Sequence, residues 1–316
     1  MFSEAKKLVE DSNKIYIVGH VNPDGDSIGS AFGMCIALRN LGKDARVVLP
    51  KYSTTFSFLP HISEYSVEFI EDEEYDLLIC VDSSDKDRLA IKPEDYDKAK
   101  KVLMLDHHEK KVPYGDVNCI YSDLPAASQI LFNFLEYMNV NITSEIAIYL
   151  YMGIMTDTGS FNYSSTKPST FVAVSKLIST GIDFADICKR VNDTKKESIL
   201  YLIRETINNM EVYFDGQIRY SYIPYSTIKE LGIDEEDAEG MTNYLRMVEG
   251  TQVAVYVRGK SDGTNKVSLR SSGKVDVSKV AIEFGGGGHK RASGYTMPED
   301  YETSKEKLLS MLGGML

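Results

Sequence analysis

Four segments of the chain end in the same way, and this shared layout strongly restricts the fold. The apolar runs 15–18, 77–81 and 102–105 each lead directly into acidic and imidazole side chains, and a helical run that ends near Thr156 does the same. In open parallel α/β sheets the carboxyl ends of the strands meet at one edge, where ligands bind. If the three strands are parallel neighbours, seven side chains meet at that edge: His20, Asp24, Asp26, Asp82, Asp106, His107 and Asp157.

Residues 1 to about 188 alternate short β-rich runs with longer helical patterns. This alternation predicts an α/β domain with a parallel sheet that is covered on both faces. Strands are expected at residues 14–19, 45–49, 76–81 and 101–105, and helices at residues 27–41, 126–138, 144–156, 168–180 and 183–191. Asp26 or Ser27 is expected to cap the first of these helices.

The sequence pattern changes near residue 194, where a charged helical run leads to residue 210. Two hairpins are expected after it, at 211–223 around Asp215-Gly216 and at 252–270 around residues 261–263. Helical patterns at 236–248, 277–284 and 303–312 complete a smaller, mixed α/β domain. A chain of 316 residues exceeds the usual size of one core. We therefore predict a catalytic domain (1–190), a helical connector (191–212) and a substrate-binding domain (213–316), with the active site in the cleft between the two domains.

The formal net charge of -12 argues against binding to long duplex nucleic acid or to an anionic membrane. Any nucleic acid partner should therefore be small. The first residues are acidic and polar where a signal peptide would be basic and then apolar, and the longest apolar stretch, 146–155, is too short to span a bilayer. These features predict a cytoplasmic protein.

The predicted cluster of acids and imidazoles has the composition of a metal site. A single aspartate at a strand end is usually a turn former or a cap, but four of the five histidines of the chain fall within these segments or the glycine-rich one below. Burying so many carboxylates without cations would cost several kcal/mol each. A donor set of imidazole and carboxylate groups without thiolate suits manganese better than structural zinc. Mg²⁺ or another divalent ion is the alternative.

Two divalent ions about 3.5–4 Å apart can lower the pKa of a bridging water and neutralise charge on a phosphate under in-line attack. The cluster therefore predicts phosphoester hydrolysis. Neighbouring residues of a strand point in opposite directions, so His108 is expected to face the substrate when His107 faces the metal. Asp106 would then orient an imidazole.

A second motif, GGGGHKRASG at residues 285–294, combines four glycines with basic side chains. Backbone N–H groups of such a run can line an anion site, whereas the simplest alternative is a flexible linker. It is not a Walker A loop, because His289 stands where that loop has glycine. The candidate substrate contacts are Arg270, Gly285, Gly286, Gly287, Gly288, His289, Arg291 and Ser293, with Arg88 as a weaker one.

The motifs HVNPDGDSIGS, VDSSD, LDHHE and TDTGSF, in this order, resemble those of the DHH phosphoesterase superfamily, and GGGGHKRASG resembles its associated C-terminal domain. The two-domain form is similar to nanoRNases, which degrade very short RNA and dephosphorylate 3'-phosphoadenosine 5'-phosphate (pAp). Dimers through the DHH domain are common in that family, so a homodimer is expected.

The resemblance also implies residue roles. One manganese ion would bind His20, Asp24 and Asp82, and the other would bind Asp26, Asp82, His107 and Asp157. His108 would contact the scissile phosphate, while Arg270, His289 and the glycine backbone would hold the distal phosphate or sugar. Phe161 or Tyr163 could stack on the bases.

The leading hypothesis is a manganese-dependent phosphodiesterase acting on short oligoribonucleotides and pAp. The same site could instead hydrolyse cyclic di-AMP or its linear product pApA. An inorganic pyrophosphatase shares the N-terminal motifs, but its C-terminal domain carries a different basic cluster. A catalytically inactive nucleotide sensor is the alternative from another class, and the complete ligand set argues against it.

Overall fold

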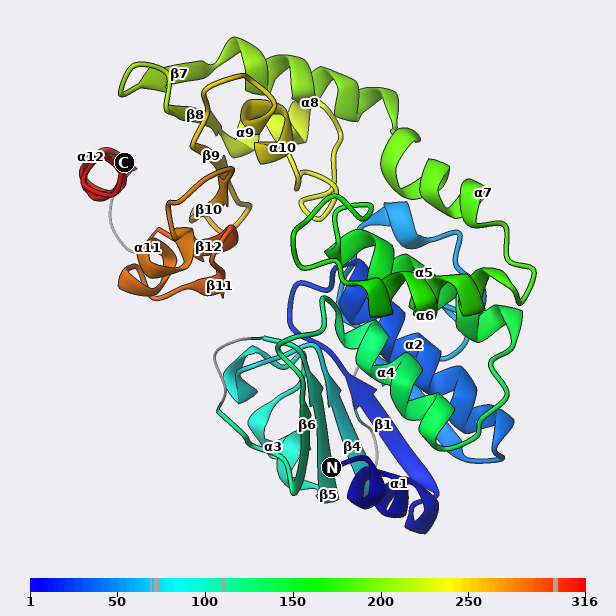
Figure 1. Ribbon diagram of the computed structural model, residues 1–316. Coiled ribbons are helices and arrows are strands. Elements are labelled where there is room, and N and C mark those ends of the chain that lie inside the picture. The colour runs from blue at the N-terminus through cyan, green and yellow to red at the C-terminus, as the bar shows by residue number, and fades with distance from the viewer. Residues whose placement is uncertain (69, 71–73, 109–111, 298–300) are drawn as a thin grey trace. The chain divides into compact units, whose positions relative to one another are not determined.

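Six parallel strands form the sheet of the N-terminal unit, Met1–Thr194, in the order β3-β2-β1-β4-β5-β6 (Figure 1). The computed structural model describes residues 1–68, 70, 74–108, 112–297 and 301–316. The strands are β1 (Lys14–Val18), β2 (Asp44–Val48), β3 (Ser66–Val67), β4 (Tyr75–Val81), β5 (Ala99–Asp106) and β6 (Val117–Ile120). The helices are α1 (Phe2–Asp11), α2 (Gly25–Asn40), α3 (Pro93–Asp97), α4 (Ala127–Tyr137), α5 (Ser144–Asp157), α6 (Pro168–Ile178) and α7 (Phe184–Cys188), followed by a π-helical turn (Lys189–Asp193). The predicted α/β class with a parallel sheet is confirmed.

The sheet is covered unequally on its two faces. One face carries Ile15, Ile17 and Ile79, which belong to a large core shared with helices α1, α2, α4, α5 and α6 (Figure 1). The other face carries Tyr16 and Leu78 and packs against a much smaller cluster near α3. Strands that are buried on both faces consist of continuous apolar runs rather than alternating ones, which explains why these strands stand out in the sequence.

Two glycines bring α2 and α5 unusually close. A Cβ atom on Gly29 would lie 2.6 Å from the carbonyl oxygen of Tyr149 and 3.0 Å from the Cα of Gly153. A Cβ atom on Gly153 would lie 2.0 Å from Oγ of Ser128 on α4. A side chain at either position would require its neighbours to move, and the close packing of the helices that glycine permits places the first turn of α2 beside the last turns of α5.

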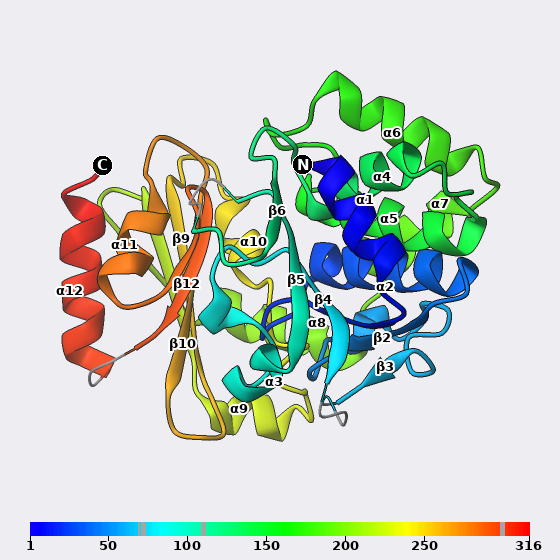
Figure 2. The same ribbon diagram turned by 90° about the horizontal axis from the view of Figure 1, so that it is seen from below.

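The C-terminal unit, Lys195–Leu316, has a mixed six-stranded sheet in the order β11-β12-β10-β9-β8-β7. Strands β8 and β9 are parallel, and the other pairs are antiparallel. Helices α11 and α12 cover one face, and α8, α9 and α10 lie against the other (Figure 2). The elements are α8 (Glu197–Asn208), β7 (Met210–Tyr213), β8 (Ile218–Ile223), α9 (Tyr225–Glu230), α10 (Thr242–Arg246), β9 (Val253–Gly259), β10 (Asn265–Ser271), α11 (Val277–Glu283), β11 (Gly287–His289), β12 (Ala292–Thr296) and α12 (Tyr301–Gly313).

Both predicted hairpins of this unit are present, as β7–β8 and β9–β10. The helix predicted at 236–248 is wrong, because only Thr242–Arg246 is helical. Gly240 has a φ of +81°, which a right-handed helix cannot accommodate, so the chain turns before the helix begins. Among the residues that the structure describes, no helix has the length and apolar character needed to cross a bilayer.

Candidate active site

Strands β1, β4 and β5 are neighbours in the sheet, and their carboxyl ends lie side by side. Val18 pairs with Cys80, and Cys80 pairs with Met104, so the three strands end nearly level. The residues that follow them include His20, Asp82 and His107, all of which are buried. The predicted meeting of the strand ends at one edge is therefore present, and it gathers the acidic and imidazole side chains of the N-terminal unit.

Asp82 lies at the centre of this group, and its two carboxylate oxygens face different partners. Oδ2 lies 3.5 Å from Nε2 of His20, whereas Oδ1 lies 3.3 Å from Nε2 of His107 and 3.9 Å from Nδ1 of His108. The backbone of Asp82 is left-handed (φ +52°). Aspartate tolerates this conformation better than most residues, and its carboxylate lies between His20 on one side and the two histidines that follow β5 on the other.

Asp24 and Asp26 are placed by the N-terminus of α2. Asp24 is the N-cap: its Oδ1 accepts hydrogen bonds from the N–H groups of Asp26 and Ser27, each at 3.0 Å. The prediction that Asp26 or Ser27 caps this helix is therefore wrong, because the helix begins one residue earlier, at Gly25. The other oxygen of Asp24, Oδ2, lies 3.9 Å from Nε2 of His20.

The carboxylate of Asp26 is held by the N-terminus of another helix. Its Oδ2 accepts a hydrogen bond from the N–H of Ala127 at 2.6 Å, and Oδ1 accepts one from the N–H of Ser128 at 2.9 Å. These residues begin α4, and free N–H groups at a helix N-terminus favour a negative charge. Helix α4 was not among the elements expected at the site. Its sequence signal is the small-residue run 126–128 at a predicted helix start.

Asp157 enters the group from the last turn of α5. Its Oδ2 lies 3.5 Å from Nε2 of His107, and the same nitrogen lies 3.9 Å from Oδ2 of Asp26. His107 thus faces three carboxylates, which come from α2, from the end of β4 and from α5. Residues of α2, β4 and α5 belong to the large core of this unit, which holds the three elements in place.

The pKa shifts in this cluster reflect an excess of buried negative charge. Burial raises the pKa of Asp26 to about 7, and the neighbouring carboxylate of Asp82 acts in the same direction. Burial also raises the pKa of Asp157 well above its usual range. For Asp82, burial opposes ionisation, but His107 and His20 outweigh it and hold its pKa well below the usual value. Burial lowers the pKa of His107 and of His20, yet the carboxylates around them raise both overall.

Cations would relieve this accumulation of carboxylates, and the donor atoms fit them. One ligand atom from each of His20, Asp24 and Asp82 lies within 4.8 Å of the other two, and the same holds for Asp26, Asp82 and His107. Nδ1 of His20 is buried without a hydrogen-bond partner. The two groups share Asp82, so imidazole and carboxylate donors suited to two divalent ions surround one carboxylate.

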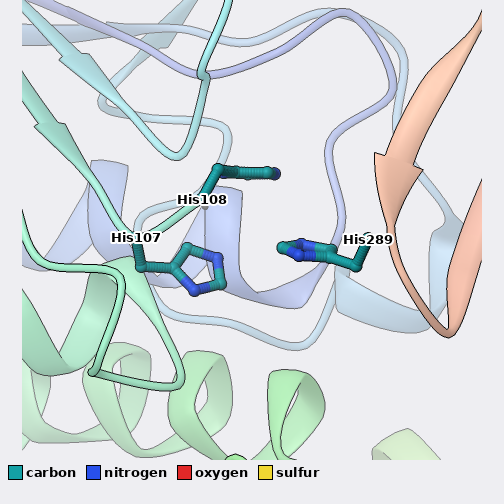
Figure 3. A group of neighbouring side chains, drawn as sticks. All are labelled: His107, His108 and His289. Atoms are coloured by element: carbon teal, nitrogen blue, oxygen red, sulfur yellow. The ribbon is translucent and has the colours of Figure 1, made fainter. Parts of the chain in front are cut away.

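His107 and His108 follow the end of β5, where Figure 3 shows their two rings beside each other. The ring centroids are 4.9 Å apart with an interplanar angle of 57°. The prediction that the two side chains point in opposite directions is therefore wrong. The alternation of a strand no longer applies because β5 ends at Asp106. Nδ1 of His108 lies 2.7 Å from Oδ1 of the fully buried Asp106, a geometry that fixes the orientation of the imidazole.

Arg88 lies beside this cluster in the N-terminal unit. Its carbonyl oxygen accepts a hydrogen bond from the N–H of Val21 at 2.8 Å, and the next residue, Leu89, forms a β-bridge with His20. The side chain of Arg88 is half-buried. The backbone next to Arg88 is thus tied to the loop that carries His20, which keeps Arg88 among the candidate substrate contacts.

The glycine-rich motif of the C-terminal unit is ordered as a hairpin of β11 and β12, which excludes the flexible-linker alternative. The N–H groups of Gly285 and Gly286 donate to carbonyl oxygens at the end of α11, so these two amides already have acceptors. A Cβ atom on Gly286 would lie 2.3 Å from the carbonyl oxygen of Gly294, and one on Gly288 would lie 2.6 Å from that of Ala292. Close contact between the strands therefore explains at least two of these glycines.

The remaining candidates of this unit differ in accessibility. Ser293 is buried and donates its hydroxyl to the carbonyl oxygen of Val277 at 2.7 Å, so a structural role accounts for it. Arg270 on β10 and His289 on β11 are half-buried, and Arg291 is exposed in the turn that joins β11 to β12. These three side chains remain the candidates for holding a phosphate or sugar.

A parallel α/β unit that carries this shared carboxylate–imidazole cluster defines a phosphoesterase of the DHH type. The chain belongs to the DHH family: the model described as "DHH family, N-terminal domain" matches residues 14–154, and the DHHA1 domain matches residues 215–315. The bifunctional oligoribonuclease and PAP phosphatase NrnA of Thermus thermophilus is 31% identical over 313 residues, which cover 98% of this chain and 91% of that protein.

A more distant relative and two solved structures complete the comparison. The cyclic-di-AMP phosphodiesterase GdpP of Bacillus subtilis is 26% identical over 325 residues, but these cover only 48% of its length. An exopolyphosphatase-related protein from Bacteroides fragilis has the same fold with a TM-score of 0.88 and 28% identity, covering 98% of this chain and 94% of that one. RecJ from Thermus thermophilus in complex with Mn²⁺ shares the fold with a TM-score of 0.59 and 15% identity, covering all of this chain and 55% of that one.

Proposed function

We propose that the protein is a manganese-dependent phosphodiesterase that hydrolyses very short oligoribonucleotides to nucleoside monophosphates and dephosphorylates pAp. The observation that carries this proposal is the division of Asp82 between two ligand groups. The name of the NrnA relative from Thermus thermophilus supports the substrate class, and the RecJ complex supports the metal. Mg²⁺ is the alternative ion, and a cytoplasmic location and a homodimer belong to the same proposal.

The proposed metal ligands fall into two sets that meet at Asp82. One set is His20, Asp24 and Asp82, and the other is Asp26, Asp82, His107 and Asp157. When bound, two divalent ions lower the pKa of a water molecule and neutralise charge on the phosphate. The chain contributes by fixing the donors: α4 holds Asp26 through two N–H groups, and α2 holds Asp24 through its capping hydrogen bonds.

His108 is the proposed catalytic group outside the ligand sets. The Asp106 carboxylate accepts a hydrogen bond from Nδ1–H of His108 and so fixes the ring, which leaves the other nitrogen, Nε2, to face the scissile phosphate. Arg88, Arg270, His289 and Arg291 are the proposed contacts to the rest of the substrate. An overall charge of -12 suits a substrate of a few nucleotides that needs no extended basic surface.

A substrate panel tests the proposal. Purified protein with Mn²⁺ is assayed on an RNA dinucleotide, a five-nucleotide RNA, pAp, pApA and cyclic di-AMP, with Asp82→Ala as the inactive control. We expect hydrolysis of the linear dinucleotide and pAp by the wild type and none by the variant. Much faster hydrolysis of cyclic di-AMP than of the linear dinucleotide would favour the alternative function, hydrolysis of cyclic di-AMP or pApA, over the proposed one. Activity in Asp82→Ala equal to that of the wild type would exclude the shared-ligand arrangement.

A further inference from the structure

The chain makes an unusual turn immediately after Asp157. Gly159, Ser160 and Phe161 all have left-handed backbones, with φ values of +56°, +56° and +67°. A left-handed conformation at a residue other than glycine costs about 1–3 kcal/mol and is commonly kept at functional sites. Hydrogen bonds to Thr158 hold the turn: the N–H of Phe161 donates to its Oγ1 at 3.1 Å, and the N–H of Tyr163 donates to its carbonyl oxygen at 3.0 Å.

This turn folds the ring of Tyr163 back over the residues that follow Asp157. Cζ, Cε1 and Cε2 of Tyr163 lie 2.4–2.7 Å from the position that a Cβ atom on Gly159 would occupy. Three ring atoms at nearly equal distance mean that one face of the ring lies on this glycine. Gly159 is two residues beyond Asp157, so their Cα atoms are at most about 7.6 Å apart. The ring on Gly159 therefore lies within about the length of one nucleotide of Asp157, a proposed metal ligand.

Tyr163 and the neighbouring aromatic candidate, Phe161, lie in different environments. The ring of Phe161 is half-buried in the large core of the N-terminal unit, with ring centroids 6.4 Å from Tyr151 and 5.6 Å from Phe171. Tyr163 has 38% of its surface exposed. A large aromatic ring that is partly exposed, that lies on Gly159 two residues beyond a proposed metal ligand, and that follows a strained turn has the properties of a base-stacking surface.

We infer that Tyr163 is the stacking surface for the nucleobase next to the scissile phosphodiester. The inference rests on the proposed function and adds a specificity-determining residue to it. Every base has a π-face, so stacking selects nucleotides over other phosphoesters without selecting a base. Such recognition suits an enzyme for short RNA of any sequence, and it requires the base to be unpaired.

Comparison of a dinucleotide with its abasic counterpart tests the inference. The values of kcat/KM are measured for the wild type, Tyr163→Leu and Tyr163→Phe on an RNA dinucleotide and on the same backbone without bases. We expect Tyr163→Leu to lower kcat/KM for the dinucleotide about 5- to 150-fold, mainly through KM. The abasic substrate should be hydrolysed within about twofold of the wild-type rate by every variant. Tyr163→Phe keeps the ring and should restore most of the activity.

Tyr137→Leu is the matched control. Tyr137 is also a tyrosine of the N-terminal unit with a similar exposure, 48%, and it is the last residue of α4. The opposite end of that helix holds Asp26, so about 15 Å of helix separates Tyr137 from the cluster. This variant should hydrolyse both substrates like the wild type.

The outcomes distinguish failure of the inference from failure of the proposed function. An equal loss on both substrates in Tyr163→Leu would assign the ring a structural role, and no loss on either would exclude stacking. A wild type that hydrolyses neither substrate would refute the proposed function. In that case calorimetry with AMP and ribose 5-phosphate decides: weaker binding of AMP alone to Tyr163→Leu supports stacking, and unchanged binding of AMP overturns it.

Discussion

Gly153 on α5 lies at a tightly packed point beside the proposed metal ligands, and Gly153→Ala tests how far the cluster depends on it. The added methyl group would lie 2.0 Å from Oγ of Ser128, 2.8 Å from its Cβ and 3.0 Å from Oδ1 of Asp26. The Ser128 side chain is fully buried, and its N–H holds the Asp26 carboxylate. The substitution must therefore push the start of α4 and Asp26 away from α5.

The expected effects on stability and on activity differ in size. Alanine gains about 1 kcal/mol of helix propensity over glycine, whereas overpacking a core costs about 1–3 kcal/mol. The net loss should be about 0–2 kcal/mol, which lowers Tm by a few degrees in a unit of 194 residues. Misplacement of a catalytic group by about 1 Å can cost about 10²-fold in rate. Turnover should thus fall far more than stability.

The assay combines thermal unfolding, with and without Mn²⁺, and dinucleotide turnover over a range of Mn²⁺ concentrations. Gly33→Ala on α2 is the matched control. Gly33 lies seven residues beyond Asp26, and its added Cβ atom would meet the flexible end of the Leu150 side chain, at 2.8 Å. We expect wild-type turnover from Gly33→Ala and a large loss, with a higher Mn²⁺ requirement, from Gly153→Ala. Wild-type turnover and Mn²⁺ dependence in Gly153→Ala would refute the reasoning.

Three further predictions follow from the same structure. His108→Ala should reduce turnover about 10²- to 10⁴-fold while metal content stays near that of the wild type, and equal losses of both would assign His108 to the ligand set instead. Asp106→Asn should retain the fold but impair orientation of the imidazole, which a loss of kcat at nearly constant KM would show. In the C-terminal unit, burial acts to raise the pKa of Glu239, but Lys266 and Arg258 outweigh it and lower its pKa to about 2. The ionised Glu239 therefore stabilises this unit above about pH 4.5, and the contribution is lost as the pH falls toward 2. Because its side chain is 36% exposed, Glu239→Gln should cost about 1–2 kcal/mol at pH 7 and progressively less in acid unfolding curves; a difference that does not depend on pH would contradict this assignment.

The strands of the catalytic unit could be predicted from the sequence because burial on both faces makes them continuous apolar runs. The ends of β1, β4 and β5 followed from this, and so did the gathering of His20, Asp82 and His107 at one edge. The binding of Asp26 by the N-terminus of α4 could not be predicted in the same way, because the hydrogen bond joins residues 101 positions apart and depends on how the helices pack.

Local backbone geometry accounts for the other differences. The prediction that His107 and His108 point in opposite directions was wrong, because side chains alternate only within a strand and β5 ends one residue before His107. The helix predicted at 236–248 has suitable periodicity, but a single left-handed glycine, Gly240, shortens it. The strands β11 and β12 were missed because a glycine-rich run carries no hydrophobic alternation, although its lack of side chains is what lets the two strands approach.

Asp82 and the donors around it come from the ends of three strands and from two helices, so no short stretch of the chain can form the cluster alone. A cation bound there recognises only the fully folded N-terminal unit. By mass action, an ion at 100 times its dissociation constant would stabilise that unit by about 2.7 kcal/mol. Depletion of the metal should therefore have two effects on this protein: it should stop turnover at once, and it should also increase the fraction of unfolded chains that proteases can degrade.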